Sequence, residues 1–166
     1  MFHDALSLVE SGPVVIRYPK GAARQVDNDD VGSGLAARQL RTGDGRLAIL
    51  AVGKMVAAAL NAADELSGRG VAATVWDVRS CSPLDPEMIA DAARHGTVVT
   101  IEDGIREGGI GMSMAAAIHA LDDRCHVSIL GVPTKFLPHA KPDRLLSQIG
   151  LDAAGIVAAW EAARDS

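Results

Sequence analysis

Two charged side chains follow a strand-like stretch of the sequence. Residues 71–76, VAATVW, are apolar or β-branched, and Asp77 and Arg79 come shortly after them. Open parallel sheets bind ligands outside the carboxyl ends of their strands, so Arg79 is placed to meet an anion. A guanidinium suits phosphate because its planar fork can bond two oxygens at once. The same pair also fits an ordinary surface loop, where charged side chains are common.

The other chemistry-bearing residues form weaker patterns. Glycines at 108, 109 and 111 precede an expected helix, whose N-terminus could attract an anion or simply pack closely. They lack the G-x-G-x-x-G fingerprint and the lysine of a phosphate-binding loop. Glu102 and Asp103 fit an acid–base pair or a solvated strand end, and the five histidines show no metal-ligand spacing. These patterns predict no catalytic, cofactor-binding or metal-binding residue in this chain.

Apolar runs that alternate with helical patterns must position these residues. A continuous apolar run at residues 47–53 indicates a strand buried on both faces. Asp85 before Pro86, and Asp152 before an alanine-rich segment, are N-cap signals. The alternation predicts an α/β fold with three αβα layers and a mostly parallel sheet. Further strands are expected at residues 13–18, 71–76, 97–101 and 126–130 with a short one near 34–40, and helices at 55–69, 86–95, 112–121, 142–150 and 153–164.

Composition excludes several classes of function. Of the 166 residues, 48% are hydrophobic but only 3% aromatic, so small aliphatic side chains must fill the core. The net charge is −5 with acids and bases interspersed, unlike the clustered basic face of a nucleic-acid-binding protein. No apolar run approaches the roughly 18 residues of a membrane span. Two cysteines without a disulfide framework favour a reducing cytoplasm.

Four ordered segments resemble one enzyme family. They are GPVVIRYPKG at residues 12–21, DVR at 77–79 with PLD at 83–85, ED at 102–103 with GGIG at 108–111, and GLDAAGI at 150–156. In this order and spacing they are similar to the carboxyl-terminal part of the 1-deoxy-D-xylulose-5-phosphate synthases, which are transketolase-like, thiamine-diphosphate-dependent transferases. That family condenses pyruvate with glyceraldehyde 3-phosphate and releases carbon dioxide, a step toward isoprenoid precursors and thiamine.

The resemblance implies a three-domain enzyme of which this chain holds the end. Residues 1–24 look like the tail of the domain that binds the cofactor's pyrimidine ring, residues 25–45 like a linker, and residues 46–166 like the transketolase C-terminal domain. Thiamine diphosphate and magnesium would then bind to the missing N-terminal domains, in the same polypeptide or supplied in trans. The resemblance also implies a homodimer and an inactive isolated chain.

In the family, arginines at the positions of Arg17 and Arg79 hold the phosphate of the aldehyde substrate. This sequence departs from the pattern where Ser80 replaces an aromatic residue, Ser82 a lysine and Lys20 an arginine, which leaves the identity of the aldehyde open. As a strand-end side chain, Arg79 is expected to contribute little to stability. Two alternatives remain: the C-terminal domain of transketolase or of a 2-oxo acid dehydrogenase beta subunit, and a non-catalytic binding or assembly module.

Overall fold

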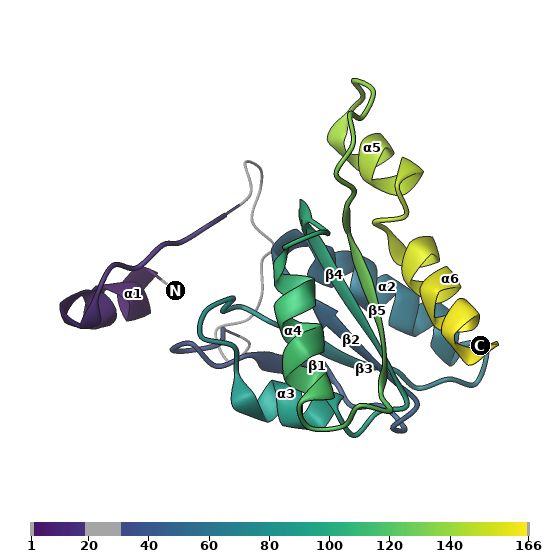
Figure 1. Ribbon diagram of the computed structural model, residues 1–166, viewed down its shortest axis with the longest axis horizontal. Helices are drawn as coiled ribbons and strands as arrows, with labels where there is room; N and C mark the ends of the chain where they lie inside the picture. The colour runs from purple at the N-terminus through teal and green to yellow at the C-terminus, as the bar shows by residue number, and fades with distance from the viewer. Residues whose placement is uncertain (1, 19–30, 166) are drawn as a thin grey trace.

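Strands and helices alternate along the chain in the computed structural model, which describes residues 2–18 and 31–165 (Figure 1). The strands are β1 (Arg38–Arg41), β2 (Leu47–Ala51), β3 (Thr74–Asp77), β4 (Thr97–Ile105) and β5 (His126–Val132). The helices are α1 (Phe2–Leu8), α2 (Val56–Ser67), α3 (Pro86–Ala92), α4 (Ile110–His119), α5 (Pro142–Gln148) and α6 (Ala153–Arg164). Lys20 and part of the expected linker lie outside the described residues.

The five strands form one sheet in the order β1-β3-β2-β4-β5. β2 pairs in parallel with β3 and β4, and β5 pairs in parallel with β4, whereas β1 runs antiparallel to β3. Helices α2 and α6 pack on one face of this sheet, and α3 and α4 pack on the other (Figure 1). The expected three-layer α/β fold with a mostly parallel sheet is confirmed.

The connections from β2 determine where a ligand could bind. The chain passes from β2 through α2 to β3 on one side, and then through α3 to β4 on the other side of β2. Such a reversal is a topological switch point, and open α/β sheets bind ligands there, beyond the carboxyl ends of the strands. We call residues 52–54, 78–85 and 102–109, which lie at this end of β2, β3 and β4, the carboxyl edge.

β2 lies at the centre of the core and is buried along its whole length. Leu47, Ile49 and Ala51 pack with the side chains of α2 and α6. Ala48 and Leu50 pack with those of α3 and α4 on the opposite face. Successive side chains of a strand point to opposite faces, so a strand covered by helices on both sides needs an uninterrupted apolar run. This burial holds the carboxyl end of β2 in a fixed place.

Two of the helices that cover the sheet, α3 and α6, begin at the N-cap residues that the sequence signals. Asp85 caps α3, its Oδ1 accepting hydrogen bonds from the backbone N–H groups of Glu87 and Met88. Asp152 caps α6 by accepting one from the N–H of Gly155. Within residues 2–18 and 31–165, no helix is both long and apolar enough to cross a membrane.

Residues 13–18 do not form the strand that their β-branched sequence predicts. The side chain of Val15 is 92% exposed and that of Tyr18 is 71% exposed. A strand needs a neighbour for its backbone N–H and C=O groups, and none of the five described strands pairs with this segment. The preceding helix α1 has no buried residue and projects away from the sheet (Figure 1).

The expected linker, residues 25–45, contributes a strand to the sheet. β1 pairs antiparallel with β3, which confirms the short strand expected near residues 34–40. The sheet therefore begins ahead of Arg46, where the sequence placed the start of the main domain. β1 has the sequence RQLR, with one apolar residue among three polar ones, so its local strand signal is weak. Its pairing with β3 depends on residues far along the chain.

Candidate functional site

The turn after β3 presents Arg79 in an unusual backbone conformation. The φ angle of Arg79 is +53°, in the left-handed region that side chains other than glycine rarely adopt. The N–H of Ser80 donates to the carbonyl of Val78 at 2.5 Å, which closes a three-residue turn around Arg79. The carboxylate of Asp77 supports this turn by accepting the N–H of Arg79 at 3.3 Å. Left-handed residues of this kind concentrate at functional sites.

The Arg79 side chain joins the β3–α3 loop to the segment that precedes β1. Its Nη1 donates to the carbonyl oxygens of Ser33 at 3.1 Å and Ala36 at 2.5 Å. Asp85 reinforces the junction, because its Oδ2 accepts the N–H of Ala37 at 2.6 Å. Arg79 therefore has a structural role that was not expected of it. A guanidinium carries five N–H donors, and within residues 2–18 and 31–165 only those of Nη1 have an acceptor.

Arg17 reaches the carboxyl edge from the exposed N-terminal segment. Its Nη2 lies 3.4 Å from Oδ1 of Asp103, near the end of β4. The other oxygen of the same carboxylate, Oδ2, lies 3.5 Å from Nζ of Lys54, in the turn after β2. Asp103 thus holds two cations beside it at the switch point between β2 and β4. Sequence reasoning missed Lys54, although it follows a buried strand just as Arg79 does.

The glycine-rich loop was predicted either to attract an anion or to pack closely, and the contacts of Glu102 support close packing. β4 runs to Ile105, so Glu102 lies within the strand and is only 6% exposed. Its Oε1 accepts the N–H of Gly111, in the first turn of α4, at 2.9 Å. A Cβ atom at Gly104 or Gly109 would lie 2.5 Å from a carboxylate oxygen of Glu102. The glycines therefore allow the loop to close around a buried carboxylate, which already occupies the N-terminus of α4.

Electrostatics connect the β3–α3 loop with Arg17 and Glu102. Burial raises the pKa of the Cys81 thiol, and the negative charge of Glu102 raises it further. The positive charge of Arg17 acts on the same thiol in the opposite direction. Arg17 contacts Asp103 near the end of β4, and Arg79 lies in the turn after β3, so both predicted arginines lie at the carboxyl edge. They have separate partners there, carbonyl oxygens for Arg79 and a carboxylate for Arg17.

The side chain of Glu107 links the β4–α4 loop to the loop after β5. Its Oε2 accepts the hydroxyl of Thr134 at 2.8 Å, and its Oε1 accepts the Arg106 guanidinium at 2.6 and 2.8 Å. These hydrogen bonds favour the ionised form, so they lower the pKa of Glu107 to about 2, with the Thr134 hydroxyl as the largest cause. The β4–α4 loop is therefore held at both of its ends.

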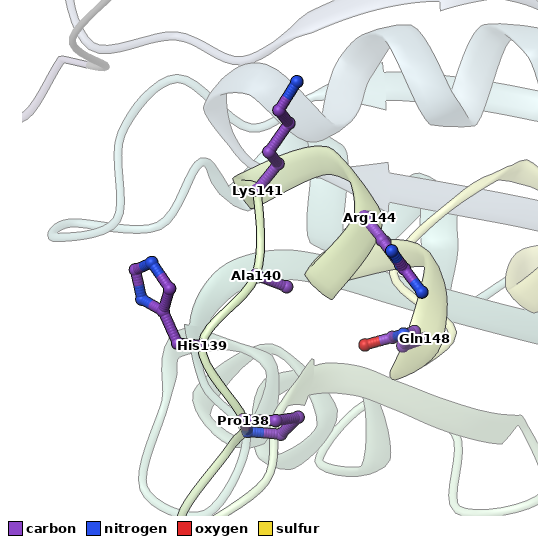
Figure 2. A pocket seen from close by; sticks show the side chains of 6 residues that line it. All are labelled: Pro138, His139, Ala140, Lys141, Arg144 and Gln148. Carbon is purple, nitrogen blue, oxygen red and sulfur yellow. The ribbon is translucent and has the colours of Figure 1, made fainter.

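A hollow of about 500 Å³ lies beside α5, and Figure 2 shows the side chains around it. Arg144 and Gln148 extend toward each other from α5, whereas Lys141 and His139 point away from them (Figure 2). The remaining lining residues are Pro138 and Ala140. The sequence-predicted arginines are not part of this hollow, whose lining comes from residues 138–148 alone.

Comparison with known proteins assigns the fold to a family. Residues 36–156 match the family described as the transketolase C-terminal domain. This match covers well over half of the chain and includes every strand of the sheet. The chain belongs to the transketolase C-terminal domain family. The matched region starts at residue 36, ahead of the start expected at Arg46.

Relatives of this transketolase C-terminal domain include enzymes named 1-deoxy-D-xylulose-5-phosphate synthase. The one from Thermobifida fusca (strain YX) is 38% identical over 160 residues, which cover 94% of this chain and 25% of the relative. The one from Methylibium petroleiphilum (strain ATCC BAA-1232 / LMG 22953 / PM1) is 40% identical over 151 residues, covering 87% of this chain and 23% of the relative. The resemblance seen in the sequence is confirmed, and the chain spans about a quarter of the length of these relatives.

A solved structure shares the same domain. It is titled "Split gene transketolase, inactive beta4 tetramer", and it superposes with a TM-score of 0.76 at 33% sequence identity. The superposition covers 86% of this chain and 46% of that one. The transketolase C-terminal domain seen here therefore also occurs in this solved split-gene transketolase.

Proposed function

We propose that this chain is the carboxyl-terminal part of a 1-deoxy-D-xylulose-5-phosphate synthase, and that it completes the site for the phosphate of the aldehyde substrate. The whole enzyme would join pyruvate to glyceraldehyde 3-phosphate with loss of carbon dioxide. The observation that carries the proposal is the position of Arg17 and Arg79 at the carboxyl edge, in a chain whose relatives bear this name.

The contacts of Arg17 suit a residue that changes partner when a ligand arrives. Its side chain is 70% exposed, and its ion pair with Asp103, at 3.4 Å, is longer than a charge-assisted hydrogen bond of about 2.7–2.9 Å. Exposed ion pairs contribute about 0–1 kcal/mol, so a phosphate could replace Asp103 at little cost. Arg79 would add its remaining donors from the β3–α3 loop, held in place by the left-handed turn.

The described residues do not fit thiamine diphosphate with its magnesium ion. In residues 2–18 and 31–165, no three His, Cys, Asp or Glu side chains gather as metal ligands. At the N-terminus of α4, the N–H of Gly111 is already bonded to Glu102. We therefore place the cofactor in the upstream domains, which would be partners in the same polypeptide or in trans, within a cytoplasmic homodimer. The part of this chain would be to bind and orient the aldehyde.

An assembly module without catalysis is the second candidate function. The N-terminal segment exposes Phe2, Leu6, Val15 and Tyr18, which are apolar side chains of the kind that bind other chains. The related split-gene subunit is titled as an inactive tetramer. A transketolase or a 2-oxo acid dehydrogenase beta subunit is less well supported, because the curated relatives reported above are named as the synthase.

Steady-state kinetics in the full-length context would test the catalytic proposal. Joined to the upstream domains, the chain should support product formation from pyruvate and glyceraldehyde 3-phosphate. Arg17→Ala and Arg79→Ala should each lower kcat/KM for the aldehyde about ten- to a hundredfold, since each removes a charged hydrogen-bond donor. The KM for pyruvate should change little. An unchanged kcat/KM in both variants would contradict the aldehyde-phosphate site and favour the assembly module.

A further inference from the structure

Lys54 lies at the point where an open α/β sheet binds ligands. It follows β2, in a 3-10 turn (Gly53–Met55) that starts with Gly53 at a φ of +58°. The turn is anchored to the neighbouring strand, because the N–H of Val52 donates to the carbonyl of Ile101 in β4 at 2.9 Å. The Lys54 side chain, one-third exposed, extends across the switch point to Asp103 on that strand.

Asp103 stands between two cations that it binds only loosely. Arg17 and Lys54 approach its two oxygens at 3.4 and 3.5 Å, so both contacts are charge pairs at distances longer than most hydrogen bonds. The carboxylate is 22% exposed and can be reached from solvent. The neighbouring acid, Glu102, is buried, and its Oε1 is bonded to the backbone of Gly111. The ion pairs that Arg17 and Lys54 form among the described residues are with Asp103 and not with Glu102.

We propose that Lys54 is a further substrate-binding residue, which together with Arg17 binds a dianionic phosphoryl group, while Asp103 is the carboxylate that this group displaces. This inference rests on the proposed function and adds a residue to its phosphate site. A monoanionic ligand would give the two cations no more charge than Asp103 already does. A phosphate monoester, with a charge of about −1.5 to −2 at pH 7, gives them more. The site is thereby selective for phosphorylated substrates over carboxylates.

The two charged partners of this site should respond to mutation in opposite directions. Lys54→Ala removes one cation and should weaken phosphate binding about tenfold, the equivalent of one charged contact. Asp103→Asn removes the competing carboxylate and should strengthen phosphate binding several-fold. If the Lys54–Asp103 pair served only the fold, both substitutions would leave phosphate affinity unchanged. Lys54→Arg should retain most of the affinity, since it keeps the charge.

The test titrates the ¹⁵N-labelled chain with inorganic phosphate, followed by NMR at low ionic strength, because salt screens charge pairs of this exposure. Saturable shifts are expected at Gly53, Lys54 and Asp103, with acetate at least tenfold weaker than phosphate. Lys141→Ala is the matched control, a lysine outside the carboxyl edge that should not change the titration. The inference would be overturned if the wild-type chain showed no saturable shifts at these residues, or if Lys54→Ala bound phosphate as tightly as the wild type.

Arg17→Ala separates a failure of this inference from a failure of the proposed function. If Arg17→Ala abolishes the phosphate response while Lys54→Ala leaves it intact, the phosphate site stands and the role of Lys54 is wrong. If Arg17→Ala and Arg79→Ala leave aldehyde kinetics unchanged in the full-length context, the proposed function fails, whatever the titration shows. A loss of phosphate affinity in Lys54→Ala together with a gain in Asp103→Asn supports the inference.

Discussion

Replacing Arg79 by alanine and by glycine should separate its backbone from its side chain. Both substitutions remove the hydrogen bonds to Ser33 and Ala36, but only glycine adopts the φ of +53° without strain. We expect the wild type to be the most stable of the three, followed by Arg79→Gly and then Arg79→Ala. This order is the opposite of the usual one, since glycine ordinarily destabilises a protein relative to alanine.

The magnitudes follow from the two kinds of contact. A net contribution of about 0.5–1.5 kcal/mol per hydrogen bond puts the loss in Arg79→Ala at roughly 1–3 kcal/mol. A left-handed conformation costs a residue with a Cβ atom about 1–2 kcal/mol, and the greater unfolded-state entropy of glycine offsets about 0.5–1 kcal/mol of this. Arg79→Gly should therefore be roughly 0.5–1 kcal/mol more stable than Arg79→Ala. For a chain of this size, 1 kcal/mol corresponds to about 2–4 °C in Tm.

Urea unfolding followed by tryptophan fluorescence would measure these differences. Trp76 is a suitable probe because it lies in β3, two residues before the turn begins at Val78, with its indole N–H bonded to Asp91 at 2.9 Å. The dependence of the unfolding free energy on urea should be the same in all three proteins. If Arg79→Ala proves as stable as Arg79→Gly, the strain argument is refuted. If Arg79→Ala proves as stable as the wild type, the two carbonyl contacts do not contribute to stability.

Two further predictions concern the loops at the ends of the strands and helices. The pKa of Glu107 is lowered from an ordinary 4.5 to about 2, with the Thr134 hydroxyl as the largest cause. The ionised carboxylate of Glu107 therefore stabilises the fold above about pH 5, and this stabilisation is lost as the pH falls toward 2. The difference in Tm between wild type and Glu107→Gln should therefore shrink to zero over that range, and a constant difference would contradict the assignment. Gly155→Ala should destabilise the chain by about 1–3 kcal/mol in chemical unfolding, because its Cβ atom would overlap the carbonyl of Gly150. Gly68→Ala, where the nearest atom is 3.4 Å away and φ is −61°, is the matched control and should be neutral or slightly stabilising.

The sequence predicted those parts of the fold that depend on local signals. The apolar run of β2, the Asp85 and Asp152 caps and the alternation of elements all concern residues that are close together in the chain. Periodicity and capping act over a few residues, so they can be read without knowledge of tertiary contacts. The carboxyl-end rule for parallel sheets then placed Arg79 correctly at the edge of the sheet.

The remaining features depend on contacts between residues far apart in the chain. The carbonyl partners of Arg79 lie 43 and 46 residues before it, and no local pattern indicates them. Residues 13–18 have the composition of a strand, but a strand forms only where a partner offers its backbone. Lys54 was missed for a different reason. The sequence does not show which strands lie beside β2, and Lys54 is recognisable at the switch point only once the strand order is known.

The antiparallel strand β1 has a consequence for how this domain can be handled as a unit. An uncovered strand at the side of a sheet offers its backbone groups to other chains and promotes aggregation. β1 covers that side of β3 and itself begins and ends with arginine, a charged residue that discourages further strand addition. A piece cut at Arg46 would lose this cover and leave β3 open to other chains. The smallest piece of the chain that can be transplanted or expressed intact therefore begins before Arg38, within the segment that the sequence alone presents as a spacer.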